Sequence, residues 1–173
     1  FMTSHPKDMS DELILAMKEC DKVCKNLHLP FQSGSTEILK KMNRHYTKEG
    51  YLELVRKVRE AMPEITLSTD IIVGFPGETD EQFEDTITLY EHCEYDLAYT
   101  FIYSPRAGTP AAKMEDDIDI HTKEQRLYRL NDLVNEKALK QNQKYLDEVV
   151  EVLVEGTSKK DDNMLTGYTR HQK

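Results

Sequence analysis

The sequence contains no tryptophan, only three cysteines and no long hydrophobic run in its 173 residues. No apolar stretch approaches the roughly 20 residues of a membrane-spanning helix, and the N-terminus lacks the regions of a signal peptide. An odd number of cysteines without dense spacing is not the framework of a disulfide-rich secreted protein. We therefore expect a cytoplasmic chain with reduced thiols and no membrane partner.

Basic residues are also in the minority: 23 Lys and Arg stand against 32 Asp and Glu, so the formal net charge is -9. Nucleic-acid-binding domains usually show a basic patch or stripe, so the charge argues mildly against an RNA partner. Only the tail concentrates cations, and two aspartates interrupt them there. These cations are Lys159, Lys160, Arg170, His171 and Lys173.

Apolar periodicity predicts an alternation of helices and strands. Helical spacing predicts helices over about 11–25, 36–42, 48–62, 79–93 and 121–146. The fourth of these opens on the capping-box pattern Thr79-x-x-Gln82. Runs of β-branched and aromatic residues before turn residues predict strands over 27–30, 65–73 and 98–103. Because such crossovers are right-handed, the sequence predicts an α/β fold with a parallel sheet.

Both ends of the sequence depart from this alternation. The apolar pair Phe1-Met2 resembles the end of a strand, so we expect the chain to begin within a fold. After residue 146 come a valine-rich segment, 149–154, a turn at Gly156 and a short apolar segment that includes Leu165. A two-stranded hairpin alone is marginal in water, so residues 147–173 are predicted to begin a different domain.

Ligands of parallel α/β sheets bind at the carboxyl ends of strands, and the loops there are unusual in this sequence. The first, 32–35, reads Gln-Ser-Gly-Ser, for which an ordinary Ser/Gly turn is an equal alternative. The second, 70–79, has two glycines whose N–H groups could face an anion or adenine, but it lacks P-loop or dinucleotide spacing and a structural turn competes. The third, 103–110, holds Arg106, either a partner for a carboxylate or phosphate or a surface arginine.

The cysteines and histidines predict no metal site. Cys20 and Cys24 have the spacing of the first half of a three-cysteine iron–sulfur motif, but Leu27 stands where the third thiolate would be. Both cysteines also fall within the predicted helix 11–25, which could not wrap a cluster. The six histidines show no zinc-ligand spacing with them.

Segments of the sequence taken together resemble the radical S-adenosylmethionine tRNA methylthiotransferase family. They are FMTSHPKDMS at 1–10, LHLPFQSGSTEILKKMNRHYT at 27–47, TDIIVGFPGETDEQFEDT at 69–86 and TFIYSPRAGTPAA at 100–112. The resemblance implies an N-terminal domain with an auxiliary 4Fe-4S cluster, a central partial (βα) TIM-like barrel with the radical cluster, and a C-terminal TRAM β-barrel that binds tRNA. Residues 1–146 would be the second half of the barrel and 147–173 the truncated start of TRAM, without either cysteine triad.

The resemblance also implies a reaction. Family members replace the C2 hydrogen of isopentenyl-adenosine beside the anticodon with a methylthio group. One S-adenosylmethionine methylates a sulfur on the auxiliary cluster, and another is reductively cleaved to the radical that abstracts hydrogen. The implied cofactors are S-adenosylmethionine and two 4Fe-4S clusters, and the implied partners are tRNA carrying isopentenyl-adenosine, a reductant and a sulfur donor. Since the cluster ligands are absent, we assign no catalytic or metal-binding residue and expect the chain alone to be inactive.

Carried onto this sequence, the resemblance places loop residues at the cofactor, with plain loop structure as the alternative for each. Those near the ribose and methionine moiety of S-adenosylmethionine would be Gln32, Ser33 and Arg44. Those beside the adenine would be Asp70, Val73 and Gly74. Those closing the floor near the cofactor or the target base would be Tyr103, Ser104 and Arg106. A tRNA phosphate is an equal partner for Arg44.

Other functions remain open. The family branch that acts on threonylcarbamoyl-adenosine shares the first two loops, but Met42-Asn43-Arg44 and the opening Met-Thr-Ser-His-Pro favour the isopentenyl-adenosine branch. A complete phosphate-binding metabolic enzyme fits less well, because these strands cannot close an eight-stranded barrel. The acidic balance opposes a pure RNA-binding module. A half sheet leaves an unpaired edge, through which we expect self-association.

Overall fold

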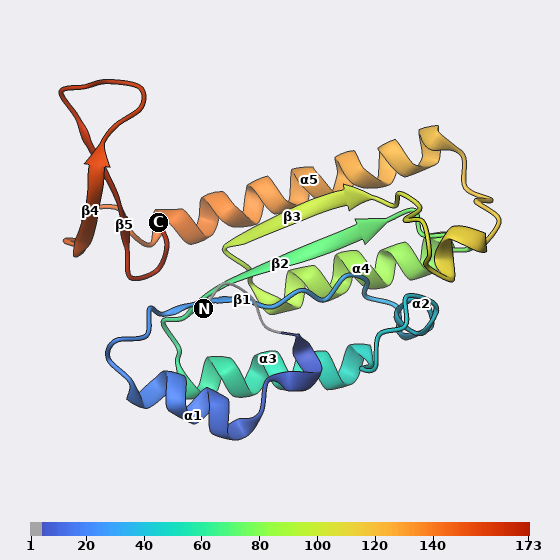
Figure 1. Cartoon of the computed structure of the whole chain (residues 1–173), viewed down its shortest axis with the longest axis horizontal. Coiled ribbons are helices and arrows are strands. Elements are labelled where there is room, and N and C mark those ends of the chain that lie inside the picture. Colours follow the sequence, from blue (N-terminus) through green and yellow to red (C-terminus); the bar gives the residue numbers. More distant parts are fainter. Residues whose placement is uncertain (1–4) are drawn as a thin grey trace.

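The computed structural model describes residues 5–173 and shows a three-stranded parallel sheet backed by helices (Figure 1). The strands are β1 (Asn26–His28), β2 (Thr66–Val73) and β3 (Leu97–Ile102), in the order β1-β2-β3. Both pairings are parallel, with Leu67 opposite Leu27 and Asp70 opposite Tyr99. The predicted α/β class is thus confirmed, whereas the prediction for Phe1 and Met2 falls outside the described residues.

The helices begin at the residues whose side chains can cap them. They are α1 (Asp11–Glu19), α2 (Thr36–Lys41), α3 (Lys48–Ala61), α4 (Asp80–Cys93) and α5 (Ile120–Gln143), with short 3-10 turns η1 (Pro6–Asp8) and η2 (Ala111–Lys113). The N-cap side chains that accept a backbone N–H belong to Ser10, Ser35, Thr47, Thr79 and Asp119. At α4 the predicted capping box is present in full, since Gln82 also accepts the Thr79 N–H.

The first predicted helix was too long, because α1 ends at Glu19 and not near residue 25. Cys20 leaves the helical conformation (φ -91°, ψ 105°), and Lys25 donates to the carbonyls of Met17 and Lys18. A side chain that satisfies the last carbonyls stabilises the helix end there. Cys20 and Cys24 are consequently exposed residues of a loop, which corrects their predicted helical setting.

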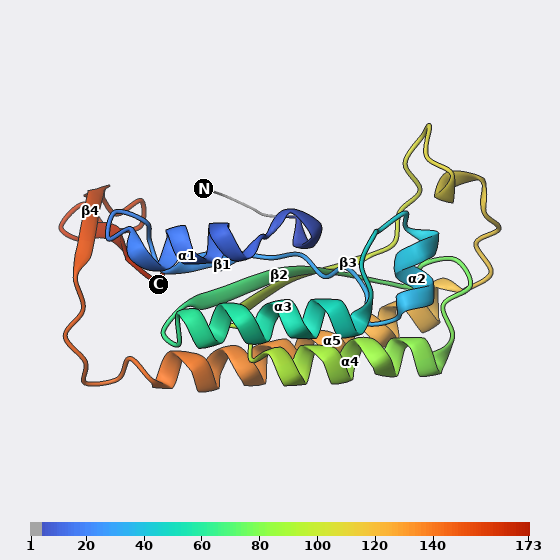
Figure 2. The same cartoon turned by 90° about the horizontal axis from the view of Figure 1, so that it is seen from below.

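One face of the sheet is covered by α3, α4 and α5, and α1 lies beside α3 (Figure 2). Side chains alternate along a strand, so β2 directs its odd-numbered residues 67–73 into this core. The even-numbered ones, with His28 of β1 and alternate residues of β3, lie on the opposite face. We call this the open face; its β3 residues Tyr99 and Phe101 each remain 51% exposed.

An aromatic group fills the core beneath β1. The rings of Phe31, Tyr51, Tyr90 and Tyr95 lie in contact, and the hydroxyls of Tyr51 and Tyr95 are 2.6 Å apart. The Tyr51 hydroxyl donates to the Leu29 carbonyl at 2.7 Å. This hydrogen bond fixes the chain where it leaves β1, immediately before the first predicted site loop.

The C-terminal hairpin lies at the amino ends of the sheet strands (Figure 1). Its strands β4 (Val152–Thr157) and β5 (Leu165–Thr169) are antiparallel, which confirms the predicted change of pattern. The tail after β5 holds it to the sheet: the Thr66 hydroxyl donates to the His171 carbonyl at 2.9 Å, and Lys173 pairs with Asp96 at 3.1 Å. That this hairpin begins a TRAM domain remains a prediction.

Both outer strands of the sheet have an unpaired edge. Within residues 5–173, β1 and β3 each pair with β2 alone. Self-association through such an edge remains a prediction. No helix in this range is both long and apolar enough to cross a membrane.

Candidate functional site

Three loops meet at the carboxyl ends of the sheet strands, at the arrowhead end in Figure 1. They are loop 1 (29–35), loop 2 (74–79) and loop 3 (103–119), and the first and third are tied to β2. The Gln32 N–H donates to the Asp70 carbonyl and the Ile72 N–H to the Gln32 carbonyl, each at 2.9 Å. The Tyr103 N–H donates to the Val73 carbonyl at 2.9 Å. The predicted loops therefore form one edge around the end of the central strand.

Some polar residues of loop 1 hold the loop together, and Gln32 is a candidate for ligand contact. Gln32 takes a left-handed conformation (φ 67°) and is 7% exposed. Ser33 is fully buried, and its hydroxyl accepts the Ser35 N–H at 3.2 Å. Gly34 packs on α4, where its N–H donates to the Thr86 hydroxyl at 2.9 Å. Ser33 and Gly34 are therefore used within the fold, and ligand contact by Gln32, which is itself buried, remains a prediction.

Loop 2 does not offer the free N–H groups that its glycines suggested. Gly74 and Gly77 both have the positive φ expected of a turn, +69° and +73°. However, the Gly74 N–H donates to the Glu78 carboxylate at 2.8 Å, and the Gly77 N–H donates to the Asp117 carboxylate at 2.7 Å. The chain's own carboxylates therefore occupy the positions where an external anion was expected.

A buried ion pair, missed by the sequence analysis, holds loop 2 on α5. Glu78 accepts from Arg126 at 2.9 Å, and their side chains are 0% and 8% exposed. Burial raises the pKa of Glu78 above its usual value, although the Gly74 N–H and the Arg126 guanidinium oppose this shift. Arg126 precedes the buried Leu130 by four residues. In the sequence, this ion pair was indicated only by a charged residue, Arg126, in the apolar stripe of the helix.

The open face carries a second polar arrangement below the loops. His28 Nε2 lies 3.4 Å from an Asp70 carboxylate oxygen, and His28 Nδ1 lies 2.9 Å from the Ser68 hydroxyl. The Tyr99 ring meets the His28 ring edge-on at 6.0 Å. The Asp70 side chain remains 30% exposed, so it can still accept from a ligand. Strand alternation between buried Leu27 and Leu29 would have placed His28 on this face.

The remaining predicted residues differ in their access to this edge. The side chain of Val73 is fully buried on the helix side, so only its backbone can contact a ligand. Ser104 and Arg106 are exposed on loop 3. The Tyr103 ring lies against Phe75 at 4.9 Å, and its buried hydroxyl has no partner among residues 5–173. Arg44, half-buried, follows α2, where its N–H donates to the Leu39 carbonyl at 2.8 Å.

The donors and acceptors at this edge fit S-adenosylmethionine but not an iron–sulfur cluster. Asp70 has a carboxylate and Gln32 an amide that could hydrogen-bond a nucleoside, and Arg44 has a guanidinium that could pair with a carboxylate. That these residues bind the cofactor remains a prediction. In the described part of the chain no three His, Cys, Asp or Glu residues are grouped as metal ligands. Cys93 lies buried in the core, where desolvation raises its pKa to about 11 and keeps it a thiol.

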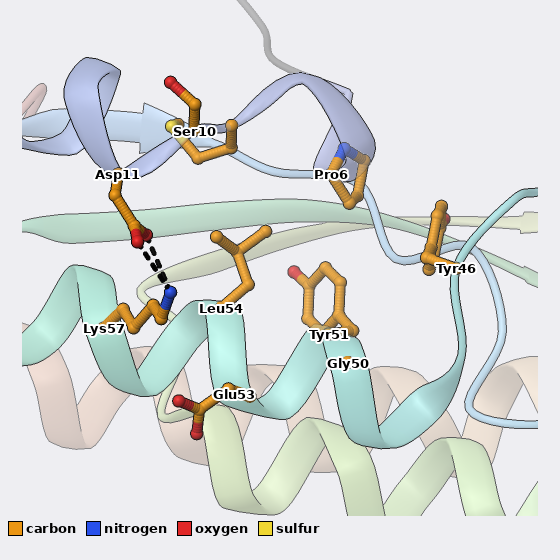
Figure 3. A pocket seen from close by; sticks show the side chains of 10 residues that line it. Pro6, Ser10, Asp11, Tyr46, Gly50, Tyr51, Glu53, Leu54 and Lys57 are labelled. Atoms are coloured by element: carbon orange, nitrogen blue, oxygen red, sulfur yellow. Dashed lines mark hydrogen bonds and ion pairs between the residues drawn. The ribbon is translucent and has the colours of Figure 1, made fainter.

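A separate hollow of about 370 Å³ lies between the η1–α1 segment and α3 (Figure 3). Its charged groups are already paired: Asp11 accepts from Lys57 at 2.7 Å, and Glu53 accepts from Arg56 at 2.6 Å. Tyr46 lines one end, and its hydroxyl donates to the Phe31 carbonyl of loop 1 at 3.1 Å. Tyr46, at the edge of the hollow, therefore helps to fix loop 1. The charged groups that line the hollow are not free to bind a ligand.

Comparison with curated proteins finds relatives that match the whole chain. A protein of Alkaliphilus oremlandii (strain OhILAs), named tRNA-2-methylthio-N(6)-dimethylallyladenosine synthase, is 61% identical over 100% of this chain and 37% of its own length. Proteins of the same name from Acetivibrio thermocellus and Geobacillus kaustophilus are each 58% identical over 100% of the chain, covering 36% and 33% of their lengths. The chain thus spans about a third of these relatives.

A solved structure and a family model give the same class. The structure of coproporphyrinogen III oxidase (HemN) from Escherichia coli, a radical SAM enzyme, matches with a TM-score of 0.63 and 19% identity, over 78% of this chain and 31% of that one. This likeness concerns the fold alone. The family model described as "Radical SAM superfamily" matches residues 1–90, which is more than half of the chain. The chain therefore belongs to the radical SAM superfamily.

Proposed function

We propose that the full-length protein containing this chain methylthiolates C2 of isopentenyl-adenosine in tRNA, and that this chain is the cofactor-facing half of its barrel. The observation that carries the proposal is identity of 57–61% with synthases of that modification over 98–100% of the chain, which includes all three loops. Residues 147–173 would begin the tRNA-binding TRAM domain of a cytoplasmic enzyme. The clusters, the reductant and the sulfur donor would involve the rest of the protein.

In this function the chain binds and orients S-adenosylmethionine, which supplies the methyl group and the radical chemistry. Asp70 hydrogen-bonds the cofactor beside the adenine, and the His28 ring lies 3.4 Å from its carboxylate. Gln32 contacts the ribose and methionine moiety, and Arg44 pairs with either the methionine carboxylate or an RNA phosphate. Loop 2 presents the Gly74 backbone to the adenine while Glu78 and Arg126 keep that turn rigid. Tyr103, Ser104 and Arg106 of loop 3 exclude water from the side of the target base.

Loop 2 argues against the alternative of a phosphate-binding metabolic enzyme. A phosphate site of that kind needs unoccupied backbone N–H groups. Here the Gly74 and Gly77 N–H groups are engaged by Glu78 and Asp117, at 2.8 and 2.7 Å. An anion would have to displace two carboxylates, so these N–H groups do not form a phosphate site, and only the carbonyl groups of the two glycines are left for a base.

Nucleoside analysis of tRNA from a strain lacking the full-length gene tests the proposed reaction. We expect isopentenyl-adenosine without its methylthio group, restored by the wild-type gene. Purified Asp70→Asn enzyme should show a KM for S-adenosylmethionine raised about 10- to 100-fold, because a hydrogen bond to a charged acceptor contributes about 1.5–3 kcal/mol. If isopentenyl-adenosine keeps its methylthio group while threonylcarbamoyl-adenosine loses it, the substrate belongs to the other branch.

Isothermal calorimetry on the 173-residue chain tests how much of the cofactor site it contains. We expect at most weak binding of S-adenosylmethionine, with a Kd of about 1 mM or weaker. The reason is that the iron that would chelate the amino and carboxylate groups has no ligands in the described residues. Circular dichroism of the same sample controls for folding. Tight binding without added iron would show that the loops suffice.

A further inference from the structure

The tail is not the only basic stretch of this acidic protein, as the sequence analysis expected, because the chain between α2 and α3 is basic as well. Residues 38–48 contain no aspartate or glutamate, although the whole sequence has a net charge of -9. We call the basic residues at its centre the basic strip; they are Lys40, Lys41, Arg44 and His45. Lys40, Lys41 and His45 are exposed, and Arg44 is half-buried.

The shape of the basic strip is fixed by its backbone. Asn43 takes a left-handed conformation (φ 59°), and its N–H donates to the Lys40 carbonyl at 3.0 Å. The Arg44 N–H donates to the Leu39 carbonyl at 2.8 Å. This pair of bonds is the Schellman motif, which satisfies the last carbonyls of α2. The cations are therefore presented from an ordered turn, which lowers the entropic cost of binding.

The basic strip lies on the rim of the candidate site. Lys41 Nζ is 3.4 Å from the Gly77 carbonyl of loop 2. Tyr46, directly after the strip, donates its hydroxyl to loop 1 and meets the His5 ring edge-on at 5.7 Å. In Figure 1, α2 stands at the arrowhead end of the strands, beside the loops. A polymer that delivers a base to these loops would pass over the strip.

The charges of the strip are not neutralised locally. Within residues 5–173, Lys40, Lys41 and Arg44 form no ion pair with a carboxylate. The two acids nearest in sequence are Glu37 and Glu49, and Glu37 accepts from Gln82 at 2.8 Å. At the end of the segment Lys48 pairs with Asp85 at 2.6 Å. The pKa of His5 is lowered, first by burial and next by the Arg44 cation, while Asp8 acts in the opposite direction. The charges of Lys40, Lys41 and Arg44 are thus left for an external anion.

We propose that the basic strip is a docking surface for the phosphate backbone of the RNA substrate. The inference rests on the proposed function for the identity of the RNA, and adds where that RNA meets this half of the barrel. Lysines in the last turn of a helix also complement its dipole. That role would account for Lys40 and Lys41, but not for cations beyond the end of α2 or for the absence of acids through residue 48.

The test compares RNA binding by the full-length enzyme and its Lys40→Gln/Lys41→Gln variant. Fluorescence anisotropy with an anticodon stem-loop RNA is measured between about 50 and about 200 mM salt. We expect about tenfold weaker binding at the lower salt and a salt slope smaller by about 0.7–0.9 for each lost phosphate contact. The affinity for S-adenosylmethionine should not change.

A matched control is Lys140→Gln/Lys144→Gln, which removes two exposed lysines at the far end of α5. If strip and control variants show the same RNA affinity and salt slope as wild type, the docking surface is refuted while the proposed function stands. A wild-type enzyme that fails to bind the RNA at all would instead overturn the proposed function, and this inference with it. Equal melting temperatures of the two variants establish that any loss is not a loss of folding.

Discussion

Replacing Arg126 with methionine is expected to lower the free energy of unfolding by about 3–5 kcal/mol at neutral pH. The change leaves Glu78, whose side chain is 0% exposed, without its cationic partner. The Gly74 N–H alone would then face a buried carboxylate, in a turn that α5 no longer holds. Urea unfolding followed by circular dichroism measures the loss.

Arg129→Met is the matched control on the same helix. Arg126 and Arg129 both lie over the Phe83 ring, at 5.7 and 5.6 Å, so each variant loses a similar aromatic contact. Arg129 pairs with Glu84, and both side chains are about half exposed. An exposed pair contributes about 0–1 kcal/mol. Equal losses in the two variants would mean that burial of the Glu78 pair has no special effect.

The pH dependence of the Arg126→Met variant gives an independent check. Burial already raises the pKa of Glu78 above 4.5, and removing the guanidinium raises it further. A folded state that holds its proton to higher pH than the unfolded state loses stability as pH rises through that window. The deficit relative to wild type should be small below pH 4.5 and grow toward neutral pH. The double variant Glu78→Gln/Arg126→Met should remove this dependence.

Gly34→Ala is expected to destabilise the chain by about 3 kcal/mol or more, because overpacking against main chain leaves little room for relaxation. A Cβ atom at this position would lie 2.3 Å from the Asp85 carbonyl oxygen and 2.5 Å from the Thr86 Cα. Either α4 moves away from loop 1 or loop 1 detaches. Both changes would also displace Gln32, so S-adenosylmethionine binding by the full-length enzyme should weaken together with stability.

Gly50→Ala is the control for Gly34→Ala, because it shows whether replacing any glycine of the chain with alanine lowers stability. Gly50 lies in the first turn of α3, where an added Cβ would meet only the Thr47 hydroxyl at 3.4 Å. Alanine is the better helix former, so we expect a gain of up to about 1 kcal/mol. A tolerated alanine at Gly34 would show that loop 1 is not packed on α4 as described.

Local rules predicted most of the fold. Strand and helix positions followed from periodicity, and the α4 boundary followed from its capping box because both are properties of neighbouring residues. The end of α1 was missed because it depends on Lys25, which folds back onto the carbonyls of Met17 and Lys18. A side chain that hydrogen-bonds carbonyls seven and eight residues away cannot be predicted from helical spacing.

The site was predicted less completely, because its roles depend on contacts between distant segments. The sequence identified all three loops, but it could not show that Glu78 and Asp117 occupy the glycine N–H groups of loop 2. Nor could it show that the Ser33 hydroxyl is used within loop 1 or that Val73 faces the helices. The nine predicted cofactor residues therefore remain a proposal, and for Val73 only the backbone can take part.

The hydrogen bond between Thr66 and the tail fixes a distance as well as a contact. Thr66 is the first residue of β2, and the eighth, Val73, ends at the loops. At about 3.3 Å per residue, the seven steps from Thr66 to Val73 separate the hairpin and the loops by roughly 23 Å. A small metabolite can contact only one of these ends at a time. A ligand that contacts both must be elongated, and the length of β2 sets how long it must be.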